Sequence, residues 1–287
     1  MLVYLNGRFL PKKDANISVD DRGFVFGDGV YEVIRVVDGK LFLAKPHMDR
    51  LKDGLAGLEI QVDENMVHNL MSVAESLIKK NDLLKGHGTV YLQITRGVAK
   101  RIHNFPAVDV QPTIYLSTSG FKPDLELQKN GAQAITMSDI RWMRCDLKTI
   151  NLLPNVLAKQ KAMDAGAFTS VFIRDGVVTE GQNANIFGVK NGVLRTYPRT
   201  NYILPGITRA LVLEMANEEN IVVDQTPINE DELLQMDEIF LTGTTTDIQP
   251  IISIDGKQVG NGKRGNIARL FQDLLHKRMT EIPSRTA

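Results

Sequence analysis

Cysteine and histidine are scarce in this sequence. Cys145 is the only cysteine among 287 residues, which excludes a disulfide within the chain, and the five histidines are scattered rather than clustered at metal-ligand spacing. We therefore expect no metal site. Cys145 reads as a small buried residue, and we expect no catalytic role for it.

Neither sign of charge is in excess, because Lys plus Arg and Asp plus Glu both number 34. Nucleic acids and anionic membranes are therefore not implied as partners. No apolar run approaches the length that spans a bilayer, and residues 1–8 read as a strand and hairpin rather than a signal peptide. A glycine-rich nucleotide-binding loop is also missing, which disfavours a nucleotide cofactor. These features agree with a metabolic enzyme, which we expect in the cytoplasm.

The chain is long enough for two domains and shows no repeats. Its periodicities indicate a mixed α/β (α+β) organisation and permit an N-terminal domain over residues 1–118, a Gly- and Pro-containing linker over 119–123 and a C-terminal domain over 124–287. The strands are expected near residues 2–5, 30–37, 41–43, 89–95, 113–117, 132–137, 170–174, 185–189 and 238–242. The helices are expected near residues 46–58, 64–81, 153–165, 208–220 and 265–277.

Lys148 stands between a mixed polar strand pattern and the apolar start of a helix, where a solvated charge is poorly placed. If its side chain is buried, the cost of desolvating the ammonium lowers its pKa, and the neutral amine becomes a nucleophile. That is the requirement for a lysine that forms a Schiff base. The ordinary alternative, a surface or ion-paired lysine, stays open on position alone.

Glu180 is the second candidate. The β-rich runs 169–173 and 183–189 are interrupted by Asp175-Gly176 and by Glu180-Gly181, so Glu180 should lie at a strand end. A carboxylate there can pair with a protonated pyridine nitrogen and keep it charged. The alternative is a turn glutamate that faces water.

Together, the Lys148 and Glu180 segments resemble the class IV (fold type IV) pyridoxal-phosphate aminotransferases, and among them the bacterial enzymes specific for D-amino acids. The resemblance runs nearly end to end and includes residues 20–32, similar to the opening signature of the family, and residues 47–51. It implies two α/β domains with pyridoxal 5′-phosphate at their interface. It also implies that Lys148 is the Schiff-base lysine and that Glu180 is the partner of the ring nitrogen.

Three further segments suit an anionic cofactor. The guanidinium of Arg50 can donate two hydrogen bonds to a phosphate, although an arginine on an amphipathic helix is usually just solvated. The turn Pro205-Gly206 leads into a helix whose first N–H groups could bind an anion, or could form an ordinary helix cap. The threonine run 244–246 could supply hydroxyl groups, or could reflect only strand propensity. By the resemblance, the phosphate is held by Arg50, by the amides of Ile207 and Thr208 and by Thr244, while Leu204 packs on the ring.

Two positions depart from the family pattern. Gln182-Asn183-Ala184 replaces a serine run that relatives often carry, and Gly243 stands where a hydroxyl residue is common. Both changes remove hydrogen bonds that could reach the cofactor, so they bear on cofactor affinity and fine specificity. They leave the lysine and its ring-nitrogen partner untouched.

Arg101 and His103 are two residues apart, so in an extended loop their side chains project to the same side. Such a pair can bind a carboxylate, or it can be part of a basic surface loop. By the resemblance, the pair comes from the neighbouring subunit of a homodimer and, with Tyr31, holds the substrate α-carboxylate.

The resemblance therefore implies transamination of D-amino acids, with D-alanine and 2-oxoglutarate converted to pyruvate and D-glutamate. The alternatives within the same fold are a branched-chain L-aminotransferase, an (R)-amine transaminase and an aminodeoxychorismate lyase. A non-catalytic cofactor-binding protein is a further alternative, which the presence of both Lys148 and Glu180 disfavours.

Overall fold

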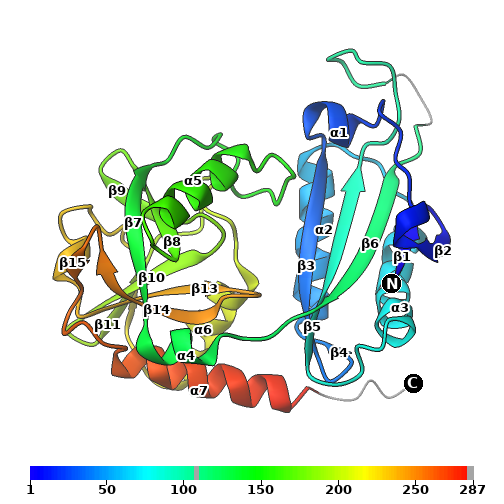
Figure 1. The fold of residues 1–287 in the computed structure, drawn as a ribbon. Coiled ribbons are helices and arrows are strands. Elements are labelled where there is room, and N and C mark those ends of the chain that lie inside the picture. Colours follow the sequence, from blue (N-terminus) through cyan, green and yellow to red (C-terminus); the bar gives the residue numbers. More distant parts are fainter. Residues whose placement is uncertain (107–109, 283–287) are drawn as a thin grey trace. The chain divides into compact units, whose positions relative to one another are not determined.

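The computed structural model describes residues 1–106 and 110–282. The chain forms two compact units, one made of residues 1–122 and 147–151 together with Ile282, the other of residues 123–146 and 152–281 (Figure 1). The sequence pattern assigns the segment 147–151 to a domain over 124–287. The segment instead groups with the first unit, because its backbone pairs with a strand there.

The first unit contains a six-stranded antiparallel sheet in the order β2-β1-β6-β5-β3-β4. Its strands are β1 (Leu2–Leu5), β2 (Arg8–Pro11), β3 (Gly29–Val37), β4 (Lys40–Leu41), β5 (His87–Thr95) and β6 (Thr113–Gly120). Side chains alternate between the two faces of such a sheet, so each central strand sends every second residue to the core.

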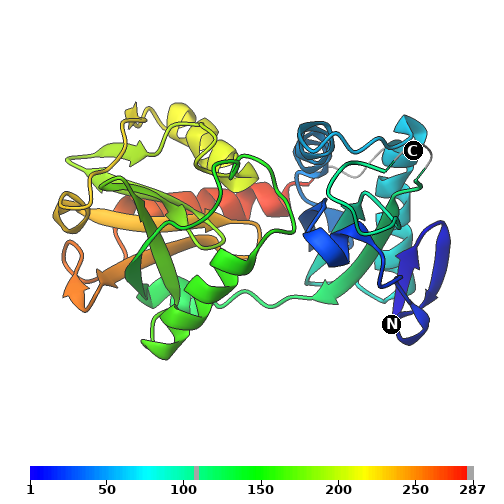
Figure 2. The ribbon, with the colours of Figure 1, turned by 90° about the horizontal axis from the view of Figure 1, so that it is seen from above.

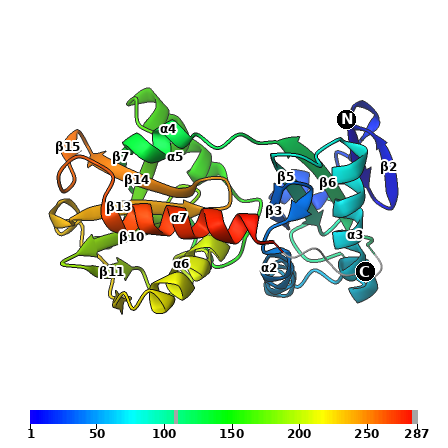
Figure 3. The same ribbon diagram turned by 90° about the horizontal axis from the view of Figure 1, so that it is seen from below.

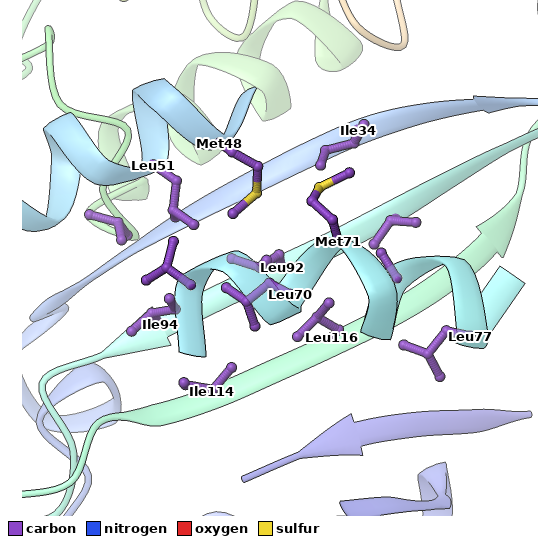
Figure 4. Packing of buried hydrophobic residues seen from close by; sticks show 14 of the residues in the cluster. Ile34, Met48, Leu51, Leu70, Met71, Leu77, Leu92, Ile94, Ile114 and Leu116 are labelled. Carbon is purple, nitrogen blue, oxygen red and sulfur yellow. The ribbon is translucent and has the colours of Figure 1, made fainter. Parts of the chain in front are cut away.

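Helices α2 (Ala44–Gly57) and α3 (Glu64–Lys80) cover one face of this sheet. Leu92 and Ile94 of β5 point into the layer between sheet and helices, where Leu51 of α2 and Leu70 of α3 meet them (Figure 4). The start of α3 is fixed by Asp63, whose side chain accepts hydrogen bonds from two backbone N–H groups of the first turn. A short helix, α1 (Arg22–Phe26), precedes β3.

Strand β4 ends at Leu41, earlier than the expected strand at 41–43. At Leu43 the backbone enters the left-handed region, with φ 53°, and α2 begins at Ala44 rather than at residue 46. The turn into the helix therefore takes the residues that the sequence pattern assigned to the strand.

The second unit contains a nine-stranded mixed sheet in the order β12-β11-β10-β13-β14-β7-β8-β9, with β15 paired to β14. Its strands are β7 (Ala132–Ser138), β8 (Thr169–Arg174), β9 (Val177–Gly181), β10 (Asn185–Lys190), β11 (Val193–Thr196), β12 (Val223–Asp224), β13 (Glu238–Gly243), β14 (Asp247–Ile254) and β15 (Lys257–Gln258). Strand β14 was not among the expected strands, and it contains Pro250, although proline lacks the N–H that a strand normally donates.

Four α-helices belong to this unit: α4 (Leu125–Asn130), α5 (Leu153–Asp164), α6 (Ile207–Glu218) and α7 (Asn266–Thr280). Helix α5, drawn in green in Figure 2, connects the parallel strands β7 and β8 and packs against them. Helices α6 and α7 lie side by side (Figure 3), and Phe271 of α7 packs 6.0 Å from the ring of Phe240 in the sheet.

The expected α/β class is confirmed. Across residues 1–106 and 110–282, none of the helices combines the length and the apolar character needed to cross a membrane.

Candidate active site

Lys148 lies on a short extended segment that pairs with β3. The amide of Tyr31 donates to the Lys148 carbonyl oxygen at 3.0 Å, and the amide of Ile150 donates to the Gly29 carbonyl oxygen at 3.1 Å. Gly29 permits this approach, because a Cβ atom there would lie 3.1 Å from Ile150 Cδ1 and 2.7 Å from the Ile94 carbonyl oxygen. The Lys148 side chain is half-buried, and its Nζ lies 4.2 Å from the centre of the Tyr31 ring.

Tyr31 belongs to a group of aromatic residues on the sheet face that points away from α2 and α3. Its ring stacks on that of Tyr91 at 5.8 Å, and Tyr91 in turn contacts Tyr115 at 6.3 Å. Burial, with a further contribution from the neighbouring tyrosines, raises the pKa of Tyr91 to about 12, so this hydroxyl stays protonated at neutral pH. The amine of Lys148 therefore lies against the edge of an aromatic surface.

Arg50 lies on the opposite face of the same strands, next to Glu32 and His47. Its Nε and Nη2 donate to the two carboxylate oxygens of Glu32 at 2.7 and 2.9 Å, while His47 Nδ1 lies 2.7 Å from Glu32 Oε2. The Glu32 side chain is fully buried, and Arg50 and His47 are nearly so. Arg50, expected to hold a phosphate, is thus oriented by a buried carboxylate that the sequence patterns did not single out.

The charges of this group are set by burial and by mutual contact. Burial raises the pKa of Glu32, but the hydrogen bond from His47 and the charge of Arg50 outweigh it and lower the pKa to about 2. Burial lowers the pKa of His47, a change that Glu32 opposes and that the charges of Arg50 and Lys148 reinforce. Glu32 is therefore a permanent anion at physiological pH.

Glu32→Gln should lower the free energy of unfolding at neutral pH. A pKa displaced from 4.5 to about 2 corresponds to about 3 kcal/mol. Because the folded-state pKa is depressed, this stabilisation is complete above the unfolded-state pKa and is lost as pH falls toward about 2. Denaturant unfolding at a series of pH values should therefore show the gap between wild type and variant shrinking on acidification. Asp49→Asn, which removes an exposed carboxylate from the same helix, should show no such gap; a pH-independent gap for Glu32→Gln would contradict the assignment.

Glu180 is buried near the end of β9, as expected for a residue at a strand end. Its carboxylate accepts hydrogen bonds from Asn185 Nδ2 at 2.9 Å and from the Leu204 amide at 3.1 Å, and it forms an ion pair with Arg141. Burial raises the pKa of Glu180, while the charge and hydrogen bond of Arg141 and the Leu204 amide oppose the rise. Arg141 and the Leu204 amide favour the charged carboxylate, which is the form that can pair with a protonated ring nitrogen.

Arg141 is held in place by a second carboxylate. Asp139 accepts from Arg141 Nε and Nη2, both at 2.8 Å, and from Arg174 Nε at 3.2 Å. The hydroxyl of Thr179, the residue before Glu180, also donates to Asp139 at 3.1 Å. Arg141 and Asp139 were not predicted as site residues, although charged residues of both signs stand shortly before Lys148.

Asn185 connects Glu180 to the start of α6. Its Nδ2 also donates to the Leu204 carbonyl oxygen at 2.9 Å. A Cβ atom at Gly206 would lie 1.9 Å from Asn185 Oδ1, so only glycine permits this packing. Gly206 is the N-cap of α6 and brings no side-chain cap, so the amides of Ile207 and Thr208 lie at the positive end of an uncapped helix.

The two departures from the family pattern have local structural roles. Gln182 is buried, and its Oε1 accepts from the Ser170 amide at 3.0 Å, so it ties β9 to β8. Gly243 ends β13, and a Cβ atom there would lie 3.3 Å from Thr246 Oγ1. Thr244 follows in the turn between β13 and β14, the strand end at which it was expected.

Arg101 and His103 are exposed on the loop that follows β5. Both approach the ring of Phe26, at 5.4 Å for the Arg101 guanidinium and 5.7 Å for the His103 ring. Phe26 was not predicted from the sequence as a site residue.

Cys145 is buried, and burial raises the pKa of its thiol to about 11, so the reactive thiolate is scarce at neutral pH.

Within the first unit, the structure therefore places Lys148 on the Tyr31 ring and gathers Arg101 and His103 around Phe26. Within the second, Asn185 joins Glu180 and Leu204 to the turn that begins α6, which carries the amides of Ile207 and Thr208.

Comparison with known proteins identifies the class to which this fold and these residues belong. Residues 29–254 match the family described as amino-transferase class IV. The chain belongs to this family, and the resemblance read from the sequence is confirmed.

The names of the similar proteins fall into two substrate classes, D-alanine and branched-chain amino acids. A D-alanine aminotransferase of Staphylococcus haemolyticus is 40% identical over 276 residues, which cover 96% of both chains. The branched-chain amino acid aminotransferase of Escherichia coli superposes with a TM-score of 0.90 over 99% of this chain and 96% of its own, at 26% identity. A T.th. branched-chain amino acid aminotransferase, solved with pyridoxamine 5′-phosphate, gives a TM-score of 0.89 at 26% identity, covering 98% of this chain and 95% of its own.

Proposed function

We propose that this aminotransferase uses pyridoxal 5′-phosphate and acts on D-amino acids, converting D-alanine and 2-oxoglutarate to pyruvate and D-glutamate. The observation that carries the substrate class is the 40% identity to a D-alanine aminotransferase over nearly the whole chain, against 26% to the branched-chain enzymes of the same fold. The exposed pair Arg101 and His103 adds a chemical reason, because an arginine beside a histidine offers several N–H donors to a carboxylate.

The residues present fit the cofactor. The uncapped start of α6 offers backbone N–H groups to an anion, and Gly206 keeps that end free of a side chain. Glu180, buried and held by Asn185, the Leu204 amide and Arg141, suits a protonated ring nitrogen. The phosphate would be held by Arg50, Ile207, Thr208 and Thr244, the ring by Glu180 and Leu204, and Lys148 would form the covalent link.

When bound, pyridoxal 5′-phosphate supplies an electron sink for the charge left at the substrate α-carbon. Lys148 would hold the cofactor through its Nζ and would act as the base that moves the substrate α-proton. Glu180 would keep the ring nitrogen protonated, and Arg141 and Asn185 hold the Glu180 carboxylate in one orientation. Arg101, His103 and Tyr31 bind the α-carboxylate.

The visible spectrum of the purified protein, titrated in turn with D-alanine, L-alanine and L-leucine, tests this function. A rapid change with D-alanine and a slow one with the L-amino acids supports the proposal. A preference for L-leucine would favour a branched-chain aminotransferase, and a preference for amines without a carboxylate an (R)-amine transaminase. Formation of pyruvate from aminodeoxychorismate would indicate the lyase. Cofactor binding without turnover would mean a non-catalytic protein.

Arg101→Ala should raise KM for D-alanine and D-glutamate sharply. A lost hydrogen bond between charged groups costs roughly 1.5–3 kcal/mol, which is about ten- to a hundredfold in kcat/KM. Amines without a carboxylate should be spared, since they do not use this contact. Steady-state kinetics on both substrate types measure the difference, with Arg269→Ala, an exposed arginine on α7, as the control. Equal losses on carboxylates and amines would rule out the proposed role.

We further propose a homodimer in which Arg101 and His103 serve the partner's site, for which their exposure in this chain is the supporting feature. Sedimentation analysis of the purified protein tests the dimer. The cytoplasm is the proposed location.

A further inference from the structure

The loop that carries Arg101 and His103 is exposed, yet carboxylate recognition needs its two side chains in fixed positions. Residues 98 and 100–105 are all exposed to solvent, and one bond inside the loop runs from the Ile102 amide to the Lys100 carbonyl oxygen at 2.8 Å. An exposed loop of this kind has little apolar burial to fix its shape. The conformation of the loop must therefore be fixed by contacts with the residues that it packs against.

The side chain of Arg22, in α1, donates hydrogen bonds to the backbone of this loop. It is only 4% exposed, and its Nη1 donates to the Ile102 carbonyl oxygen at 2.8 Å and to that of Asn104 at 3.5 Å. Ile102 is the residue between Arg101 and His103. The guanidinium of Arg22 therefore holds the backbone at the centre of the proposed carboxylate-binding pair.

Arg22 also fixes the ring that the two side chains contact. Its guanidinium lies 4.8 Å from the centre of the Phe26 ring, which Arg101 and His103 approach at 5.4 and 5.7 Å. A second contact at the base of the loop runs from the Arg22 amide to the Gly97 carbonyl oxygen at 2.9 Å. The same buried arginine thus contacts both the backbone between the two residues and the ring that their side chains approach.

Asp28 orients Arg22. Its Oδ2 accepts from Arg22 Nε and from Arg96 Nε, both at 2.8 Å. Arg96 donates further to the carbonyl oxygens of Leu58 and Glu59. Because Asp28 is itself fixed by Arg96, Arg22 has one orientation from which its remaining donors point at the loop.

We propose that Arg22 is a positioning residue for substrate specificity, which sets the geometry of Arg101 and His103 through the Ile102 carbonyl oxygen and the Phe26 ring. The inference rests on the proposed function, since it assumes that this pair binds the α-carboxylate. Arg22 does not touch the substrate, and it acts through the loop.

Arg22→Lys is the informative variant. Lysine keeps the positive charge beside Asp28 but carries all its donors on one nitrogen, so it cannot reproduce the separate contacts of Nε with Asp28 and of Nη1 with the Ile102 carbonyl oxygen. A displacement of about 1 Å in a positioned group costs on the order of a hundredfold. We expect kcat/KM for D-alanine to fall about ten- to a hundredfold, mainly through KM. The half-reaction with D-alanine amide, which lacks the carboxylate, should stay within about threefold of wild type.

A double-mutant cycle separates positioning from a general structural effect. If Arg22 acts through Arg101, Arg22→Lys should cause little further loss in the Arg101→Ala background. Arg35→Lys is the matched control, because Arg35 is a buried arginine of the same unit whose guanidinium lies 4.1 Å from the centre of a different ring, that of Phe121. It should leave the ratio of D-alanine to D-alanine amide activity unchanged. Trypsin should also cleave Arg22→Lys faster than wild type after Lys100 or Arg101.

These measurements distinguish a failure of the positioning role of Arg22 from a failure of the proposed carboxylate contact. Equal losses on D-alanine and its amide, or losses that multiply in the double variant, would overturn the positioning role while leaving the D-amino-acid function intact. If Arg101→Ala alone leaves D-alanine kinetics unchanged, the proposed carboxylate contact fails, and this inference fails with it. Should Arg22→Lys not fold, Asp28→Asn makes the same test, because it keeps the arginine and removes the charge that orients it.

Discussion

Lys148→Ala should abolish transamination while the protein still folds. The substitution removes the proposed covalent anchor of the cofactor and the amine proposed to move the proton, and the loss of general acid–base catalysis alone costs roughly a hundred- to ten-thousandfold. The backbone contacts of the segment, from the Tyr31 amide and to the Gly29 carbonyl oxygen, do not use the side chain and should persist. Single-turnover measurements with D-alanine give the rate, and circular dichroism reports the fold.

Borohydride reduction followed by mass spectrometry supplies a second measurement. Wild type should retain the mass of the reduced cofactor on a peptide that contains Lys148, and the variant should not. Lys159→Ala is the matched control, because Lys159 is also half-buried and its Nζ lies 5.2 Å from the centre of an aromatic ring, that of Phe168. Near wild-type turnover by Lys148→Ala would refute the assignment, whatever the colour of the protein.

Glu180→Gln should leave the cofactor bound but slow the half-reaction by about a hundredfold, the usual cost of losing one oriented electrostatic contact in an active site. A neutral amide cannot keep the ring nitrogen protonated, so the charge left at the α-carbon loses its sink. The effect should be larger than that of a lost peripheral contact, because Glu180 is buried and held by Asn185, the Leu204 amide and Arg141. Glu180→Asp, which keeps the charge, should be milder.

Breaking a buried ion pair also destabilises a protein, so stability must be measured beside the rate. Glu238→Gln provides the control: Glu238 is a partly buried carboxylate of the same unit that accepts from the first amides of α7 at 3.0 and 2.9 Å. It should cost stability and spare the half-reaction. If Gln and Glu at position 180 gave the same rate, the residue would not face the ring nitrogen.

The sequence predicted those strands and helices in which apolar residues recur at a regular spacing, every second residue in a strand or every three to four in a helix. The alternation in β5 and the helical spacing of Leu70, Ala74 and Leu77 in α3 place these residues in the core, because one face of each element must leave water. The pattern did not predict β14, where Pro250 lies inside a strand, or the early start of α2 at Ala44. In both cases pairing or turn geometry overrode a local preference.

The sequence by itself determined the class of this protein, since Lys148, Glu180 and the motifs around them stand in the order and at the spacings of one family. Only the tertiary structure decided what holds those residues. Arg141 and Asp139 behind Glu180, Glu32 behind Arg50, and Arg22 beneath Arg101 and His103 are polar contacts between elements that are separate in the chain. Hydrophobic periodicity reports which face of an element is buried, whereas a buried charge finds its partner only when the folded chain brings the two together.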